Sequence, residues 1–363
     1  MSEPEARGAG WTEERAERGT SEHVTGEARD SSAPMAERGA LKSRDLVELV
    51  RAPAALTVPG DVLAGAAAAG WPFGRATAAL AASSACLYWA GMALNDYADR
   101  EVDEVERPGR PIPSGRVTPR FALGLAAGLT AAGVGLAGLA GGRRALGVTG
   151  PLAATVWAYD LVLKQTRAGP AAMAAARGLD VLVGAGAGRL RPAVPAAALV
   201  ASHTLAVTVL SRREVSGADP RLPRATLAAT GLIGAATGLI GIVTGSTGMA
   251  SGSTGMASGR TGMASGRMGA ATAYTGRGSR RRAGRLLGAG LLAVYGATFG
   301  KAQLDAVRDP APARMQRAVG AGILGLMPLQ AALAAGAGAP VAAVPVAAAF
   351  PLARRLSRRV SPT

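Results

Sequence analysis

An apolar run that leads directly into acidic residues decides how this chain folds: ATAALAASSACLYWAGMAL at residues 76–94 is followed by NDYADREVDEVE at residues 95–106. The first segment contains no charged residue, and it is long enough for a helix to cross the roughly 30 Å hydrocarbon core of a bilayer. Six residues of the second segment are Asp or Glu. The sequence therefore predicts a membrane-spanning helix that ends in a carboxylate cluster.

The same pattern of apolar blocks and short Arg-bearing loops continues through most of the 363 residues. Such blocks are typical of polytopic membrane proteins. We therefore predict an all-α fold, a polytopic transmembrane helical bundle of nine spans. The spans are expected at 50–70, 76–96, 119–140, 145–163, 171–188, 193–211, 225–244, 286–304 and 316–336. The apolar piece 340–353 is short for a full crossing, and it leaves a tenth, tilted or re-entrant helix as an alternative.

Composition argues against two soluble classes of protein. An Ala-rich soluble bundle would place polar residues at every third or fourth position, and blocks such as Phe121–Ala140 and Leu227–Val243 lack that period. The formal net charge of +16 could indicate a nucleic-acid partner, but aromatic residues make up only 4% of the chain and the Arg residues lie between apolar blocks. Membrane topology explains this charge better, and we expect no nucleic-acid partner.

The distribution of basic residues predicts which loops face the cytoplasm. With the N-terminus inside, the second, fourth, sixth and eighth loops carry fifteen Lys and Arg residues, and the opposite short loops carry five. This asymmetry follows the positive-inside rule. Two Arg-rich segments do not follow the rule, because with nine spans the insert before Leu286 and the tail 354–359 would both lie outside. A tenth crossing would bring the tail inside.

Three regions are expected along the chain. Residues 1–44 are of mixed charge and read as a disordered cytoplasmic tail, and residues 45–355 form the transmembrane domain. Within that domain, three copies of a seven-residue unit occupy 246–266. Each copy has two Gly residues, which disfavour a helix, so residues 245–285 are predicted to be a flexible inserted loop.

The acidic segment has the spacing of a metal site. Asn95, Asp99 and Asp103 are four residues apart, so on a helix they lie along one face, with Asp96 beside it. Oxygen ligands from successive turns suit Mg²⁺, which takes one or two carboxylates together with substrate phosphates. The alternative is a solvated charged loop that Arg100 and Arg107 neutralise.

The loop that follows is RPGRPIPSG at residues 107–115. Its prolines restrict the backbone and its glycines permit tight turns. The planar guanidinium of Arg110 is suited to binding a phosphate group.

These two motifs, at the end of a second apolar span, resemble the first signature of the UbiA superfamily of intramembrane prenyltransferases, and the chain resembles a divergent bacterial member of it. The resemblance extends over about residues 45–355. It implies a bundle with a lateral cavity open to lipid, in which Mg²⁺ bridges hold a polyprenyl diphosphate. Ionisation of the allylic diphosphate then allows an acceptor to capture the carbocation, with Asp99 and Asp103 as catalytic residues.

The resemblance also implies a second carboxylate motif, at the cytoplasmic end of the sixth span. The matching stretch is SRREVSGAD at 211–219. Glu214 fits the pattern, Ser211 stands where an Asp is usual, and Asp219 comes one position late. A second metal ligand set of Glu214 and Asp219 is one interpretation. The other is that Arg212 and Arg213 replace the metal charge at the diphosphate.

Further candidates lie on the fourth and fifth spans and on the first. YDLVLK at 159–164 resembles a family segment, which makes Tyr159 and Lys164 substrate-binding candidates, although an interfacial Lys that reaches toward water is an alternative. Asp61, Asp160 and Asp180 are ionisable residues at membrane depth, which are functional candidates by default. Asp61 and Asp160 could bind an acceptor hydroxyl or act as bases. Asp180 could bind substrate or pair with Arg177.

The predicted protein is therefore a multi-pass prenyltransferase of the plasma membrane, with its active site on the cytoplasmic side. It would move an isoprenyl group from a polyprenyl diphosphate to a small aromatic or alcohol acceptor, with Mg²⁺ as cofactor and membrane lipid as its surroundings. The alternative is a non-catalytic lipid-binding, isoprenoid-binding or transport-associated membrane protein that retains the fold.

Overall fold

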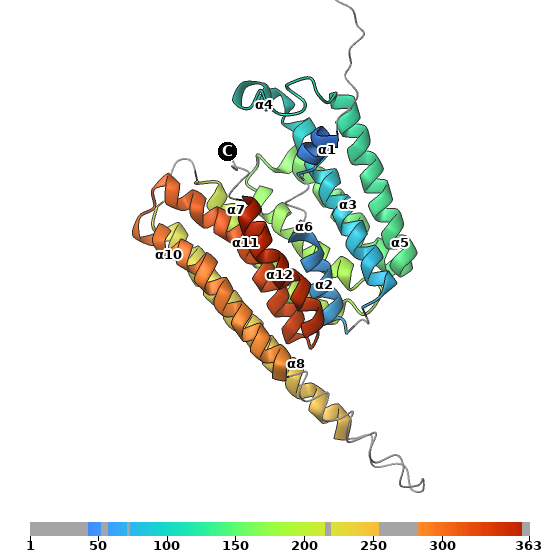
Figure 1. Ribbon diagram of the computed structural model, residues 1–363, viewed down its shortest axis with the longest axis vertical. Helices are drawn as coiled ribbons and strands as arrows, with labels where there is room; N and C mark the ends of the chain where they lie inside the picture. Colours follow the sequence, from blue (N-terminus) through green and yellow to red (C-terminus); the bar gives the residue numbers. More distant parts are fainter. Residues whose placement is uncertain (1–42, 52–56, 71–72, 215–218, 254–281, 358–363) are drawn as a thin grey trace, which may run out of the picture. The chain divides into compact units, whose positions relative to one another are not determined.

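The computed structural model describes residues 43–51, 57–70, 73–214, 219–253 and 282–357. These residues form helices joined by short loops, without a β-strand among them (Figure 1). The all-α expectation is confirmed. Residues 1–42 of the predicted tail and residues 254–281 of the predicted inserted loop lie outside the described residues.

The helices follow one another in this order: α1 (Ser43–Leu49), α2 (Val58–Ala68), α3 (Arg75–Ala98), α4 (Arg100–Glu106), α5 (Pro119–Ala158), the π-helix η2 (Tyr159–Leu163), α6 (Gly169–Gly184), the short 3₁₀-helix η3 (Arg191–Ala193), α7 (Val194–Ser211), α8 (Arg221–Ser253), a helix over 282–295, the π-helix η5 (Gly296–Gly300), α10 (Lys301–Arg308), α11 (Pro312–Gly336) and α12 (Pro340–Ser357).

Five helical segments among the described residues are long and apolar enough to cross a membrane: Arg75–Ala98, Pro119–Leu163, Arg191–Ser211, Arg221–Val243 and Pro312–Gly336. The longest of them is interrupted at Gly142, whose φ of 60° lies in the left-handed region that favours glycine. This break separates the two spans predicted at 119–140 and 145–163. The chain is thus a multi-pass membrane protein, and the total of nine or ten crossings remains a prediction.

Close packing of small residues joins the helices around the centre of the bundle. Gly65 of α2 and Gly184 of α6 each face the backbone of the opposite helix, at Val181 and Val62, so closely that an added Cβ would collide. Such contacts are typical of membrane helices, which gain little from apolar burial because lipid is equally apolar. On α3, Ser83 donates a hydrogen bond of 2.6 Å to the carbonyl of Gly133 on α5.

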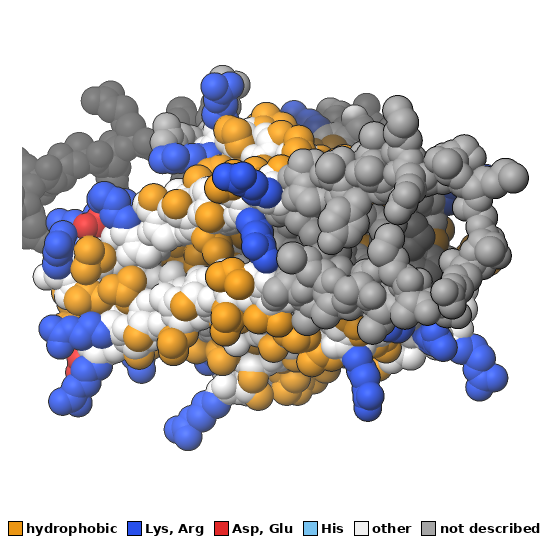
Figure 2. All heavy atoms as spheres, turned by 90° about the horizontal axis from the view of Figure 1, so that it is seen from below, with side chains coloured by type: hydrophobic (Ala, Val, Ile, Leu, Met, Phe, Trp, Pro, Cys, Tyr) orange, Lys and Arg blue, Asp and Glu red, His pale blue; other side chains and the backbone are white. Residues whose placement is uncertain are grey.

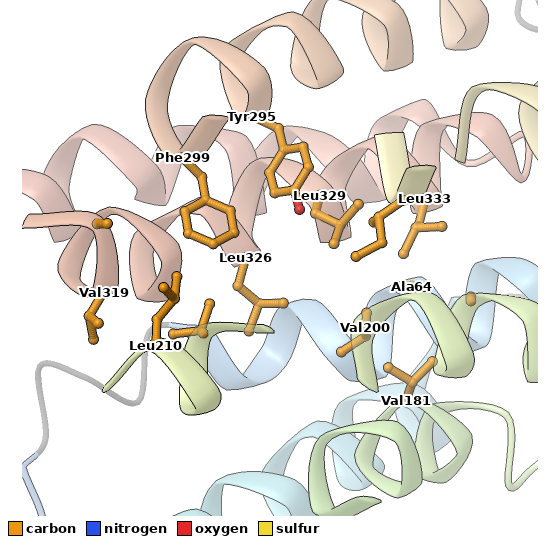
Figure 3. Close-up of a cluster of buried hydrophobic side chains, with 14 of the residues drawn as sticks. Ala64, Val181, Val200, Leu210, Tyr295, Phe299, Val319, Leu326, Leu329 and Leu333 are labelled. Atoms are coloured by element: carbon orange, nitrogen blue, oxygen red, sulfur yellow. The ribbon is translucent and has the colours of Figure 1, made fainter. Parts of the chain in front are cut away.

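The largest buried cluster lies between α7, α11 and the helix that leads into η5. Tyr295, at the end of that helix, and Phe299 of η5 project toward Leu326 and Leu329 of α11, while Leu210 of α7 lies nearby (Figure 3). Viewed from below, the molecule shows apolar side chains between scattered Lys and Arg residues, with very few acids (Figure 2). The acids gather instead near the junction of α3 and α4.

One boundary differs from the sequence prediction. The inserted loop was expected from residue 245, but α8 continues to Ser253 and includes the first seven-residue repeat. Adding residues to an existing helix costs far less than starting one, so the long apolar segment 221–243 can carry a Gly-containing continuation.

Candidate active site

The carboxylates gather where α3 passes into α4. Asp99 lies between the two helices, with φ −89° and ψ 2°. The backbone N–H of Asp99 still donates to Asn95 (2.9 Å) and that of Asp103 to Asp99 (2.8 Å). Asn95, Asp99 and Asp103 therefore keep their four-residue stacking across the junction, as the sequence predicts.

Asp96 lies beside this row and is almost fully buried. Its Oδ1 accepts hydrogen bonds from Arg110 at 2.7 Å and from Arg51 at 3.2 Å. Two guanidinium groups thus balance one buried carboxylate. Arg110 comes from the Pro-rich loop, as predicted, and it also lies 3.9 Å from Oδ2 of Asp103.

Arg51 is a site residue that the sequence analysis missed. It follows α1 with a left-handed φ of 46°, and its Nη2 also lies 3.4 Å from Oδ1 of Asn95. Arg116 holds α1 in place by ion pairs with Asp45 (2.5 Å) and Glu48 (2.9 Å). These carboxylates, Glu48 first, raise the pKa of Arg116 above its ordinary value. The available signal was a lone Arg at the start of the first span, on the side of the acidic loop.

Asp103 is buried as well, although it belongs to a short surface helix. Its carboxylate lies 3.8 Å from Arg107 and 3.9 Å from Arg110. At these distances the groups attract one another without a hydrogen bond. Asp103 therefore has oxygens that a further ligand could engage.

The π-helix η2 brings three predicted residues to the same place. Lys164 follows η2, and its Nζ lies 2.5 Å from Oδ1 of Asp99. Asp160 accepts a long hydrogen bond of 3.4 Å from Asn95, and Tyr159 lies within electrostatic range of Asp99 and Asp160. Single-turn π-helices are rare and frequently occur at functional sites.

The second motif contacts the first through Arg212. Its guanidinium donates to the carbonyl of Lys164 at 2.9 Å and to that of Thr166. Arg213 is exposed, and Glu214 continues the turn, where burial raises the pKa of its carboxyl. Asp219 accepts from the backbone N–H of Arg221 (2.8 Å) at the start of α8.

Asp61 and Asp180 form a separate buried polar group, deeper in the bundle. Asp61 lies 3.1 Å from Arg177 and accepts a 2.7 Å hydrogen bond from Gln330. Asp180 accepts from Ser84 at 2.5 Å. Ser84 precedes Asn95 by eleven residues on α3, or roughly 16 Å along a helix. Arg177 thus forms its ion pair with Asp61, rather than with Asp180 as the sequence alternative proposed.

Sequence comparison supports the resemblance to a known family. Residues 56–215 match the model of the UbiA prenyltransferase family. The matched region contains the carboxylate cluster, Lys164, Arg212 and the deep pair of Asp61 and Arg177. The resemblance drawn from the two motifs is confirmed.

Among the chain's curated relatives are two archaeal digeranylgeranylglyceryl phosphate synthases. One, from Methanopyrus kandleri, is 41% identical over 109 residues, which cover 30% of this chain and 38% of the relative. The other, from Ignicoccus hospitalis, is 42% identical over 125 residues, which cover 34% and 41%. The matches thus span about two fifths of each relative's length.

A solved structure supports the fold. The chain resembles a structure described as "Structural and mechanistic insights into the biosynthesis of Digeranylgeranylglyceryl phosphate synthase in membranes". The TM-score is 0.56 at 16% identity, and the match covers 81% of this chain and 98% of the other. At this identity the likeness establishes the helical architecture alone.

The residues present fit a divalent metal by their chemistry, and members of this family generally use one. Asn95, Asp99 and Asp103 offer oxygen atoms, which Mg²⁺ prefers over nitrogen or sulfur. Within the described parts of the chain, no three acidic, His or Cys side chains are already arranged to hold a metal ion. Arg110 and Lys164 balance these carboxylates instead.

Proposed function

We propose that this chain is an integral-membrane prenyltransferase, which moves an isoprenyl group from a polyprenyl diphosphate to a small acceptor. The observation that carries the proposal is the convergence of Asp99 and Lys164 at 2.5 Å, next to the Asn95, Asp99 and Asp103 row. This arrangement places anionic oxygens, which can hold a metal ion, beside an ammonium group at one end of an apolar bundle. A prenyl diphosphate would bind its phosphates to the charged groups and its hydrocarbon chain to the apolar helices.

The basic residues of the site are suited to bind the diphosphate. Arg110 and Lys164 were predicted for this role, and Arg51 joins them. Mg²⁺ held by Asn95, Asp96, Asp99 and Asp103 would supply positive charge that stabilises the leaving diphosphate. Fixed cations of this kind act most strongly on charge that develops as the C–O bond breaks.

The second motif would hold this arrangement from the opposite side. Arg212 supports the backbone at Lys164, so we assign it a positioning role in addition to its predicted diphosphate contact. Tyr159 remains a substrate-binding candidate. Arg213 remains a candidate for a second positive charge at the diphosphate. Glu214 and Asp219 remain candidate ligands of a second metal.

Attack of an acceptor hydroxyl on the carbocation forms a C–O bond and releases one proton. Asp160 is suited to accept that proton because it lies at the level of Asn95, and the hydrogen bond that it accepts from Asn95 is long, at 3.4 Å. Asp61 was an equal candidate from the sequence. Since Arg177 and Gln330 already engage it, we favour Asp160.

The relatives' name favours an alcohol acceptor over an aromatic one, because it describes a glyceryl phosphate that carries geranylgeranyl groups. It also favours turnover over the non-catalytic alternative. The excess of basic residues in the loops around the site supports a plasma-membrane protein whose active site faces the cytoplasm.

Purified protein should release pyrophosphate from geranylgeranyl diphosphate in the presence of Mg²⁺ and form a prenylated product. The acceptors to compare are geranylgeranylglyceryl phosphate and 4-hydroxybenzoate, with product detected by mass spectrometry. Chelation of the metal should abolish both signals, and added Mg²⁺ should restore them. The proposal would be contradicted if the protein formed neither pyrophosphate nor a prenylated product with any prenyl diphosphate of ten to twenty carbons.

Substitution of Arg51 tests the residue that only the structure revealed. Arg51→Gln should weaken binding of geranylgeranyl diphosphate about tenfold, because a charge-assisted hydrogen bond contributes about 1.5–3 kcal/mol. Arg100→Gln is the matched control, since Arg100 pairs with the exposed Glu101 outside the cluster. Titration of the diphosphate against each purified variant gives the comparison, and equal affinities of the two variants would exclude Arg51 from the site.

A further inference from the structure

A groove whose lining shares no residue with the carboxylate cluster lies between α8 and the helix that runs from 282 through η5 into α10. Its volume is 710 Å³, which is within the range of small-molecule sites. It is lined by Leu227, Thr230, Gly231, Gly234, Ala235, Leu292, Ala293, Tyr295, Gly296, Gly300, Lys301 and Leu304.

Glycines keep this groove open on both walls. A Cβ added at Gly231 or Gly234 on one wall, or at Gly296 or Gly300 on the other, would meet no atom within 4 Å. The glycines therefore do not serve close helix contact there. They leave a space that larger side chains could fill without a collision.

The hydroxyl groups of the lining form hydrogen bonds within the protein and do not point into the groove. Tyr295 shares a 2.9 Å hydrogen bond with the buried His203, and Thr230 donates to the carbonyl of Thr226 at 2.9 Å. Figure 3 shows Tyr295 and Phe299 directed toward α11. The surface that an occupant of the groove would contact is therefore mainly hydrocarbon.

Lys301 supplies charge at one end. It is the only charged residue among the described ones that line the groove, its side chain is 72% exposed, and it pairs with Asp305 at 3.0 Å. It opens the amphipathic helix α10, which lies in the basic loop predicted to face the cytoplasm. A Lys at the membrane end of such a loop lies at the depth of the lipid headgroups.

The length of the groove matches one leaflet. From Leu292 to Lys301, where the headgroup would lie, its longer wall extends about 14 Å at 1.5 Å per residue. One leaflet accounts for half of a hydrocarbon core of roughly 30 Å, or about 15 Å. A single acyl chain would therefore extend along the wall with its headgroup beside Lys301.

We propose that this groove is a binding site for an anionic glycerophospholipid, with one acyl chain between α8 and η5 and the phosphate at Lys301. The prenyl donor is a poorer candidate because the groove belongs to another part of the bundle. α8 packs against α7, α10, α11 and η5, whereas α3 packs against α5 and α2 (Figure 1). The proposal is independent of prenyl transfer.

Native mass spectrometry of the full chain, with phosphatidylglycerol and phosphatidylcholine of identical acyl chains, tests this site. The unmodified protein should retain one phosphatidylglycerol and prefer it about fivefold, as expected for about 1 kcal/mol per Lys near a lipid phosphate. Gly234→Leu and Gly296→Leu, made separately, should each reduce retained lipid at least about tenfold by filling the groove from opposite walls. Lys301→Gln should retain lipid but lose the headgroup preference.

Gly128→Leu is the matched control, because Gly128 is also exposed on a spanning helix with open space at its Cβ. It should retain lipid like the unmodified protein, and melting temperatures should confirm that each variant is folded. Undiminished lipid in both groove variants, or an unchanged preference in Lys301→Gln, would overturn the proposal. So would extraction of an isoprenoid in place of phospholipid, or a dimer that Gly234→Leu converts to a monomer.

Discussion

Asp99→Ala should abolish prenyl transfer, with a loss of at least about a thousandfold in kcat/KM, and it should remove Mg²⁺-dependent binding of the diphosphate. Asp99 is both a predicted metal ligand and the partner of Lys164, so its removal affects two groups that bind the donor. Several fixed charges act together in such sites, and loss of one electrostatic contact commonly costs about 10²–10³ in kcat. Asp103→Ala should act in the same direction.

The measurement is transfer of a labelled geranylgeranyl group together with equilibrium binding of the diphosphate, with and without Mg²⁺. Glu104→Ala is the control because Glu104 lies on the same short helix with an exposed side chain. It should retain activity. Undiminished diphosphate affinity in both Asp variants would remove the carboxylate row from the active site, even if transfer had been lost.

Asp61→Ala should instead affect the stability of the bundle. Asp61 is fully buried, and its loss would leave the guanidinium of Arg177 without its carboxylate partner. Breaking a buried ion pair on one side typically costs about 3–5 kcal/mol. The same substitution removes the acceptor of the Gln330 hydrogen bond, which ties α2 to α11.

Unfolding of the purified protein in detergent would show this loss as a lower transition midpoint. The double variant Asp61→Leu, Arg177→Met should recover most of it, because an apolar pair of similar volume can replace a buried ion pair. Asp305→Ala is a surface control, since its partner Lys301 is largely exposed, and it should leave the midpoint unchanged. A stable Asp61→Ala protein that had lost transfer alone would restore Asp61 as the catalytic base.

The sequence predicts the helices well because each depends on local composition. The apolar run 76–94 gives α3 almost to its ends, and the four-residue spacing of Asn95, Asp99 and Asp103 survives because the backbone hydrogen bonds continue through the junction. The family resemblance implied only that Lys164 binds substrate. Its contact with Asp99 depends on how α5 packs along α3.

Contacts between distant segments were harder to predict. Arg51 reaches Asp96 only because α1 folds back over the acidic loop and Arg116 fixes it there. Similarly, the sequence offers Asp180 as a neighbour of Arg177, one turn away on the same helix. The actual partner is Asp61, which the packing of α2 against α6 brings within 3.1 Å.

The π-helix η2 has a consequence for how this protein tolerates change in length. A π-turn accommodates one residue more than an α-helical turn, so removing any residue from 159–163 would let α5 run on as a regular helix. The residues that follow would keep their rotational phase, because the regular turn completes the same rotation with one residue fewer. Loss of a residue from the regular part of α5 would instead rotate Lys164 by about 100° relative to the residues before the deletion. The chemistry at this end of the bundle thus depends on a rotational phase as much as on which side chains are present, and η2 is a place where the chain can shorten without altering that phase.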